Sequence, residues 1–185
     1  AYKLGVKTHT TVNAVKGYYN RIIRYLIFGN CLKNNTYPFS VSAERLSQAL
    51  HIAEHAMNLR ADAVAHGSTG AGNDQVRFDM IFHIMIPGVE IITPIRDLKL
   101  SREEEIAYLK SKGVEINFEK AMYSINKGLW GTTVGGKETL SSKGMLPEEA
   151  WPTQVTKTGR EEVKLQFEKG ELKKVNDKRF NHPSE

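Results

Sequence analysis

The feature that most constrains the fold is a short apolar run that opens into a glycine-rich turn. Residues 63–65 are Ala-Val-Ala, bounded by polar residues, and three glycines follow within residues 67–72. Such a run is typical of a buried parallel strand, and glycines let backbone amides approach a ligand closely. A helix predicted over residues 73–85 aims its positive N-terminus at the same place. The segment therefore predicts an α/β fold with a ligand site at the end of a strand.

The spacing of the glycines excludes the two common nucleotide motifs. Their order is G-x-x-G-x-G, whereas the dinucleotide fingerprint is G-x-G-x-x-G. Asn73 and Asp74 stand where the loop G-x-x-x-x-G-K-[ST] has its lysine and hydroxyl. The turn offers instead an amide, a carboxylate and, three or four positions on, the guanidinium of Arg77. These groups together could hold the carboxylate and the amine of an amino acid.

Helical periodicity dominates the chain before this segment. It predicts a helix over residues 12–28 with Gly29 as its left-handed C-cap, and Ser42 as the N-cap of a second helix. The apolar stripe of the second helix is predicted at Leu46, Leu50, Ala53 and Met57. His51 and His55 fit the zinc-peptidase pattern H-x-x-E-H, but they lie opposite this stripe and are predicted to be solvated.

The elements after the glycine turn continue an α/β order. Residues 89–95 read as a strand, and Ser101 with Glu104 forms a capping box for a helix that ends near Lys112 and is closed by Gly113. Helices alternating with strands in this way predict a parallel sheet.

The composition of the sequence changes in its last third, where glycine and polar residues become frequent. A domain change is predicted between Glu115 and Tyr123, which divides the chain into residues 1–117 and 118–185. In the second part, residues 163–167 and 172–175 flank Lys169-Gly170 and predict a β-hairpin.

Charge and composition limit the function classes. The net charge is +5, with the excess of basic residues spread over the first hundred positions and no basic run. Spaced arginines suit a phosphate and carboxylate pocket at least as well as a polyanion groove, so a nucleic-acid module remains the alternative. No apolar run has the length of a membrane span, and the single Cys31 cannot form an internal disulfide. We therefore expect a cytoplasmic protein without membrane or nucleic-acid partners.

The string G-S-T-G-A-G-N-D-Q-V-R-F, residues 67–78, resembles the signature of argininosuccinate synthases. Further resemblance extends over R-Y-L-I-F-G-N at 24–30, T-Y-P-F-S-V-S-A-E-R at 36–45, Y-S-I-N-K-G-L-W-G-T-T at 123–133 and T-K-T-G-R at 156–160. The chain is thus similar to that family along nearly its whole length, with its strongest similarity expected in a bacterial branch.

The resemblance implies an ATP-dependent ligase of two domains. Residues 1–117 would be a nucleotide-binding domain of the N-type ATP pyrophosphatase, adenine nucleotide alpha hydrolase-like class, and residues 118–185 the start of an α+β synthetase domain. The family condenses citrulline and aspartate, using ATP with Mg²⁺ and no prosthetic group, to argininosuccinate, AMP and pyrophosphate through a citrullyl-adenylate. It serves arginine biosynthesis and the urea cycle as a cytoplasmic homotetramer.

The resemblance also implies roles for single residues. Matches to the citrulline site are Tyr37, Ser42, Asn73, Arg77, Ser124 and Thr133. Matches to the aspartate site are Thr69, Asn73 and Asp74, and matches to the ATP site are Gly67, Thr69, Asp74 and Asn126.

This sequence departs from the family pattern at three places. The family's S-G-G-L-D-T-S loop, which binds the pyrophosphate end of ATP, is not in the sequence. Asn126 stands where many relatives have aspartate, and an acidic residue near Gly135 is absent. We therefore expect an internal fragment of the enzyme that lacks both ends and is inactive by itself.

Overall fold

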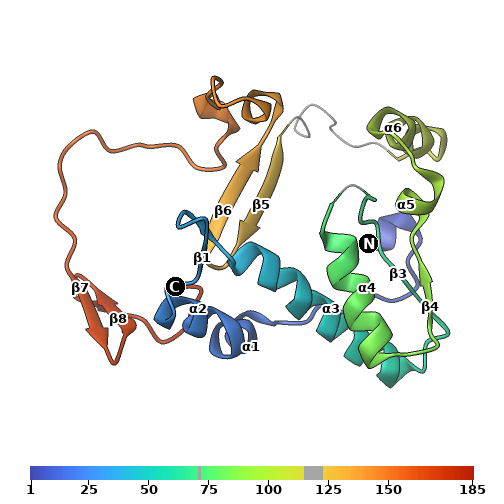
Figure 1. The fold of residues 1–185 in the computed structure, drawn as a ribbon, viewed down its shortest axis with the longest axis horizontal. Helices are drawn as coiled ribbons and strands as arrows, with labels where there is room; N and C mark the ends of the chain where they lie inside the picture. The colour runs from blue at the N-terminus through green and yellow to red at the C-terminus, as the bar shows by residue number, and fades with distance from the viewer. Residues whose placement is uncertain (71, 115–122) are drawn as a thin grey trace. The chain divides into compact units, whose positions relative to one another are not determined.

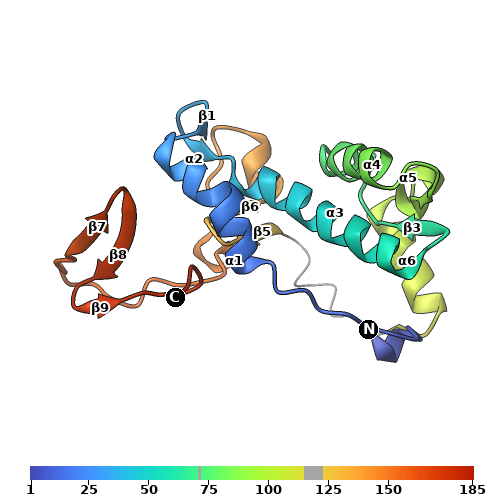
Figure 2. The same cartoon turned by 90° about the horizontal axis from the view of Figure 1, so that it is seen from below.

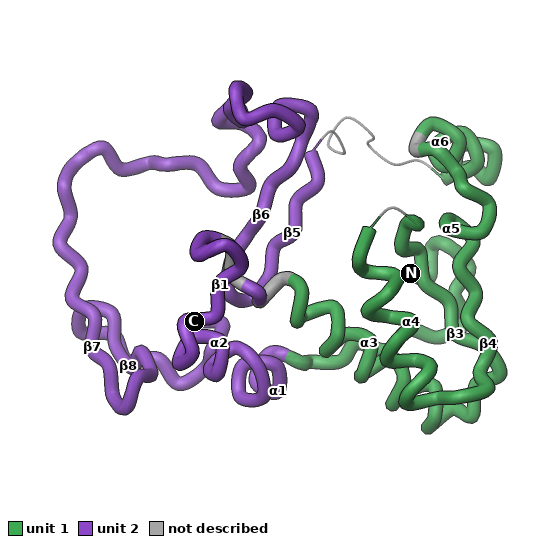
Figure 3. The backbone as a smooth tube through the Cα atoms, in the orientation of Figure 1, with its two compact units in different colours: residues 1–14, 42–118 green, residues 15–41, 119–185 purple. Residues whose placement is uncertain are grey.

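The computed structural model describes residues 1–70, 72–114 and 123–185. The chain divides into two compact units, and the first consists of residues 1–14 and 42–118 (Figure 3). The second consists of residues 15–41 and 119–185, so a segment from the N-terminal third joins the C-terminal third. The domain change predicted between Glu115 and Tyr123 falls on residues 115–122, which lie outside the described residues.

The first unit is built around a β-α-β motif (Figure 1). Helix α3, Ser40–Leu59, leads to strand β3, Ala63–Ala65; helix α4, Asp74–Met85, then connects β3 to strand β4, Glu90–Ile92. The two strands pair in parallel, with Val64 opposite Ile91. The predicted α/β fold is confirmed.

The core of this unit lies between α3, α4 and the strand β3. Its buried members are Ala49, Ala53, Ala56, Val64, Phe78, Phe82 and Ile86. Three alanines at helical spacing on α3 let the bulky rings of Phe78 and Phe82 approach the helix closely. The predicted stripe was wrong at Met57, which is 45% exposed, because the small residues face the core instead of the larger ones. The helix also begins at Ser40, so Ser42 lies inside its first turn and is not the N-cap.

The strand predicted over residues 89–95 is shorter, because Pro94 begins a helix. Pro94 has no amide hydrogen to give to a strand ladder, and its fixed φ suits the first helical position. Helix α5 accordingly spans Pro94–Leu98, with Thr93 as its N-cap residue. The predicted capping box of helix α6, Arg102–Ser111, is confirmed, since Glu104 N donates to Ser101 Oγ at 3.3 Å and Ser101 N donates to Glu104 Oε2 at 2.7 Å. Gly113 follows with a φ of 70°. A short 3-10 turn, η1 at Tyr2–Leu4, precedes all of these elements.

The helix predicted over residues 12–28 begins at Val15 and belongs to the second unit. It consists of α1, Val15–Tyr18, a π-helical segment, η2 at Tyr19–Ile23, and α2, Arg24–Phe28. Gly29 is not its left-handed residue, because the φ of Gly29 is −82° and that of Asn30 is 45°. Cys31 N donates to Leu26 O and Asn30 N to Ile27 O, which is the Schellman pattern with Asn30 in the glycine position.

The remaining elements in the described part of the second unit are antiparallel strands and two 3-10 turns. Strands β1, Leu32–Lys33, and β2, Tyr37–Pro38, pair, and so do β5, Ser124–Gly128, and β6, Gly131–Gly135. The turns are η4, Lys137–Leu140, and η5, Glu148–Ala150. Strands β7, Leu165–Glu168, β8, Glu171–Val175, and β9, Lys178–Arg179, form a three-stranded sheet (Figure 2).

The predicted hairpin around Lys169-Gly170 is confirmed. Lys169 has a φ of 51° and Gly170 a φ of 82°, and positive values at both central residues are typical of the turn that matches the twist of a two-residue hairpin. The β5–β6 hairpin is an element that the sequence did not predict.

Candidate functional site

The glycine turn lies at the carboxyl edge of the parallel pair, between β3 and α4. Asn73 is the N-cap residue of α4, and its side chain makes no capping hydrogen bond. Among the described residues other than its neighbours in sequence, a Cβ built on Gly67 would come no closer than 4.0 Å to an atom, and one on Gly70 or Gly72 no closer than 3.7 Å. Packing within the chain therefore does not require these glycines, and the turn keeps an open face where a ligand of a parallel sheet would lie.

Four side chains meet beside this turn, and we call them the Asp74 cluster: Ser42, Arg45, Asp74 and Arg77. Arg77 Nη1 donates to Asp74 Oδ1 at 2.6 Å, and Arg77 Nη2 donates to Ser42 Oγ at 3.2 Å. Arg45 Nε donates to the other oxygen of Asp74, Oδ2, at 3.3 Å. Helix α3 supplies two of these residues and the first turn of α4 the other two. The structure thus brings together three of the residues predicted for the amino-acid site, Ser42, Asp74 and Arg77.

The Asp74 cluster borders an open depression of about 400 Å³. The lining residues are Arg45, Gln48, His66, Gly67, Ser68, Thr69, Gly72, Asp74 and Phe78. Gly67 and Thr69, both predicted to contact ATP, therefore share one concavity with Asp74.

A second polar network ties the ends of β3 and β4 to α4. His66 follows β3, and its Nε2 lies 3.0 Å from Asp79 Oδ1. Arg96 Nη1 donates to the other carboxylate oxygen, Asp79 Oδ2, at 2.5 Å. Burial by itself would raise the pKa of Asp79, but the hydrogen bonds from Arg96 and then His66 outweigh it and hold that pKa below its ordinary value. The network extends to Gln75, whose Oε1 accepts from Arg96 at 3.3 Å.

Sequence reasoning assigned no role to His66, Gln75 and Asp79, although a signal for them was present. Gln75 and Asp79 are four positions apart on α4 and so lie on one face of the helix. Polar residues on a helix face beside the end of a buried strand indicate a polar network at that edge.

Three of the predicted site residues of the second unit, Ser124, Asn126 and Thr133, lie on the β5–β6 hairpin. Asn126 pairs with Thr133 across the hairpin, and Asn126 Nδ2 donates to Thr133 Oγ1 at 3.4 Å. Ser124 lies two positions before Asn126 and so on the same face of the strand, where its cross-strand neighbour is Gly135. Tyr37 lies in β2, and its side chain is outside what the structure describes.

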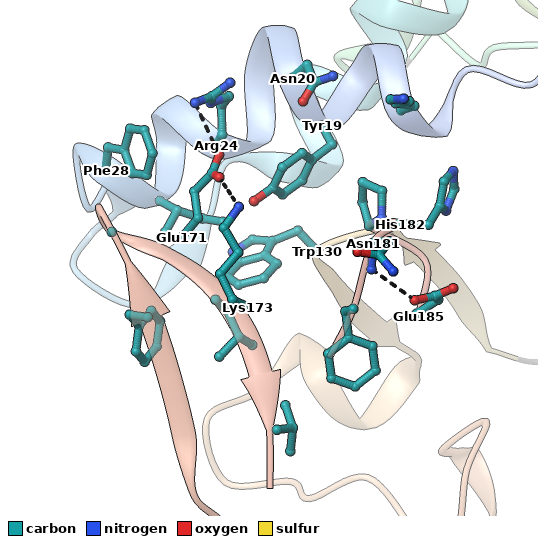
Figure 4. Close-up of a pocket in the computed structure, with 18 of the residues that line it drawn as sticks. Tyr19, Asn20, Arg24, Phe28, Trp130, Glu171, Lys173, Asn181, His182 and Glu185 are labelled. Carbon is teal, nitrogen blue, oxygen red and sulfur yellow. Dashed lines mark hydrogen bonds and ion pairs between the residues drawn. The ribbon is translucent and has the colours of Figure 1, made fainter. Parts of the chain in front are cut away.

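A separate cavity of about 560 Å³ lies in the second unit (Figure 4). Its wall contains an ion-pair cluster in which Glu171 accepts from Arg24 at 3.1 Å and from Lys173 at 2.5 Å. The hydrogen bond from Lys173 lowers the pKa of Glu171 below its ordinary value, against the effect of burial and with help from the charge of Arg24. Trp130 and Phe28 also border this cavity, and none of the predicted site residues whose side chains the structure describes does.

Within residues 1–70, 72–114 and 123–185, no group of three or more His, Cys, Asp and Glu side chains is arranged to hold a metal ion. In the H-x-x-E-H pattern, His51 Nδ1 is hydrogen-bonded to Glu54 Oε2 at 3.2 Å. Within the same ranges no helix combines the length and the apolar character needed to cross a bilayer.

A β-α-β motif with an open glycine turn and charged side chains at its carboxyl edge is typical of a ligand-binding α/β protein, and the nucleotide-binding HUP class is the one that the family match gives. The family model described as the arginosuccinate synthase N-terminal HUP domain matches residues 1–115. The chain belongs to the argininosuccinate synthase family.

Curated relatives agree with this membership. The argininosuccinate synthase of Sulfolobus acidocaldarius is 37% identical over 182 residues, which cover 98% of this chain and 46% of the relative. That of Saccharolobus solfataricus is 39% identical, covering 97% of this chain and 46% of the relative. That of Methanocaldococcus jannaschii is 40% identical, covering 92% and 44%. The chain spans about half the length of these relatives, which are archaeal, so the predicted closeness to a bacterial branch is not confirmed.

Proposed function

We propose that this chain is part of an argininosuccinate synthase and carries residues that hold citrulline and aspartate beside ATP. In the proposed reaction the ureido oxygen of citrulline attacks the α-phosphorus of ATP, and pyrophosphate leaves with the electrons of the broken P–O bond. The amine of aspartate then attacks the ureido carbon of the citrullyl-adenylate and loses a proton, and AMP leaves. The substrate ATP would enter as its Mg²⁺ complex. Such chemistry depends on positioning and on charge neutralisation more than on a side-chain nucleophile.

The observation that carries this proposal is the contact of Arg77 with both Ser42 and Asp74. Arg77 supplies a planar fork of donors that suits the carboxylate of citrulline, and its neighbours hold the guanidinium beside the glycine turn. Ser42 adds a hydroxyl for citrulline, and Asp74 a negative charge for the amine of aspartate. Asn73 stands at the N-cap of α4 with its amide not used for capping, so it is available to both amino acids.

The glycine turn supports the nucleotide part of the proposal. Its glycines are not explained by packing within the chain, whereas close approach of a ribose or phosphate would require them. We assign Gly67, Thr69 and Asp74 to the ATP side, and Thr69 also to aspartate. On the hairpin of the second unit we assign Ser124 and Thr133 to citrulline and Asn126 to ATP, with Tyr37 as a further citrulline contact.

We further propose that the complete enzyme is a cytoplasmic homotetramer in arginine biosynthesis and the urea cycle. The 185-residue chain spans about half the length of its relatives, so we expect it to bind citrulline or aspartate weakly and not to turn over.

Calorimetry on the 185-residue chain tests this function. We expect heat of binding with citrulline or aspartate, and at least tenfold weaker citrulline binding in Arg77→Lys, because lysine cannot form the bidentate contact. Arg21→Lys, at an exposed position in the second unit, is the matched control and should bind like the wild type. Pyrophosphate release should be absent. Binding of neither amino acid, together with salt-sensitive binding of DNA or RNA, would favour the alternative of a nucleic-acid module.

A further inference from the structure

The side chain of Gln75 spans the mouth of the glycine turn. Its Nε2 donates to Gly70 O at 2.6 Å and to Gly72 O at 3.4 Å. Glycines have no side chain by which a turn can be held, so a restraint must act on backbone groups, and here it acts on two carbonyl oxygens. Gln75 lies in the first turn of α4, and it therefore links the glycine turn to a rigid helix.

The orientation of the Gln75 amide is set by Arg96. A guanidinium can only donate hydrogen bonds, so the amide atom facing Arg96 Nη1 must be the oxygen. The NH₂ group is then directed at the carbonyls of the glycine turn. A glutamate at this position could accept from Arg96 but could not donate to those carbonyls.

Arg96 is itself held in place from two sides. Its Nη1 donates to Asp79 Oδ2, and its Nε donates to Thr93 Oγ1 at 3.1 Å. Thr93 is 1% exposed, so this anchor does not move freely. Arg96 thereby connects the end of β4 to helix α4.

Asp79 is fixed in turn by His66 at the end of β3. Ser68 N donates to His66 Nδ1 at 3.3 Å, which requires that this nitrogen carry no proton. The proton on Nε2 is then directed at Asp79 Oδ1. His66 is stacked on Phe78, with ring centroids 5.3 Å apart, and its side chain is 6% exposed.

We propose that Gln75 is a positioning residue, which Arg96 orients so that it holds the glycine turn in the shape that receives aspartate and the nucleotide. The chain of contacts from Gln75 through Arg96 and Asp79 to His66 ties the turn to both strands. A glycine-rich turn without such a restraint must be ordered when the ligand binds, and that ordering weakens binding. The consequence for ligands rests on the proposed function, whereas the restraint of the turn does not.

The test compares Gln75→Glu with the wild-type chain by two measurements. Hydrogen exchange of the segment at residues 66–73, without ligand, reports the restraint itself. Calorimetry with aspartate and citrulline reports its effect on binding. The net value of a hydrogen bond predicts exchange about fivefold to tenfold faster and an affinity about fivefold to tenfold lower in the variant.

The matched control is Gln154→Glu in the second unit. Gln154 Nε2 also donates to two backbone carbonyls, Glu148 O at 2.8 Å and Trp151 O at 3.1 Å. This variant introduces the same charge and breaks the same kind of contact, but it should leave both measurements on the glycine turn at wild-type values. If Gln75→Glu also loses exchange protection in α3, the variant is destabilised beyond the glycine turn. Gln75→Met, which lacks both the donor and the charge, is then the second variant.

The outcomes separate the two proposals. Unchanged exchange at residues 66–73 in both Gln75 variants would overturn the positioning role, whatever the chain binds. Faster exchange with no amino-acid binding by the wild type would support the restraint and contradict the proposed function. Faster exchange with unchanged affinity for a wild type that does bind would show that the restraint has no role in the ligand site and overturn the inference.

Discussion

Asp74 and Arg77 lie one helical turn apart at the start of α4, and Asp74 Oδ1 accepts from Arg77 Nη1 at 2.6 Å. Both side chains are partly exposed, at 41% for Asp74 and 26% for Arg77. Opposite charges are therefore placed side by side at the carboxyl edge of the parallel pair. In the proposed site this ion pair would be replaced by two others when an amino acid binds. An amine would then pair with Asp74, and a carboxylate with Arg77.

Replacement of Asp74 by asparagine tests the role of its charge. The variant keeps the shape but loses the attraction for an amine, so aspartate affinity should fall about tenfold, the value of one charge-assisted contact. Citrulline affinity should fall less, because Arg77 is retained. Calorimetry with both amino acids measures the difference, with Asp62→Asn at an exposed position as the control. Equal losses for the two ligands would contradict an amine-binding role for Asp74.

Asp79 should make the free energy of unfolding of the first unit depend on pH in the acid range. In an unfolded chain its carboxyl titrates near 3.8, and the hydrogen bonds from Arg96 and His66 lower the pKa in the folded chain. The carboxylate therefore stabilises the fold fully above the unfolded value, and this contribution is lost as the pH falls through the folded pKa.

Urea unfolding at several pH values checks this expectation. Asp79→Asn should lose about 1–3 kcal/mol of the free energy of unfolding near neutral pH and much less at the acid end. Glu90→Gln, at an exposed position on β4, is the control and should follow the wild-type profile. A constant deficit of Asp79→Asn across the pH range would show that its charge is not responsible.

The face of α3 that forms the core can be tested at Ala53. This residue is fully buried against α4, so Ala53→Leu should overpack the core and cost about 1–3 kcal/mol. Met57→Ala should change the free energy of unfolding by less than about 0.5 kcal/mol, because Met57 is largely exposed. Urea unfolding of both variants measures the two values. A loss for Met57→Ala as large as that for Ala53→Leu would place Met57 in the core, as the predicted stripe had it.

Local signals in the sequence predicted most elements correctly. The capping box at Ser101 and Glu104 and the Lys169-Gly170 turn are confirmed, because each depends on residues a few positions apart. Errors arose where local rules compete. Gly29 was predicted as the left-handed residue, but Asn30 adopts that conformation and Gly29 continues the helix.

The candidate site was predicted only in part, for a related reason. Asn73, Asp74 and Arg77 lie within five positions of the sequence and could be read as one helical turn. Their contacts with Ser42 and Arg45 on α3 could not be derived from spacing, since they depend on how α3 packs against α4. The same holds for His66, Asp79 and Arg96, which come from three separate elements.

By itself the sequence determined the α/β class, the glycine turn and the groups that α4 presents at its first turn. These features follow from residues within a few positions of each other, where backbone geometry and periodicity are sufficient. Only the tertiary structure decided which side of α3 is the core and which residues restrain the turn. Both depend on packing between segments distant in sequence, because a hydrogen bond between helices forms only where the buried side chains allow them to approach.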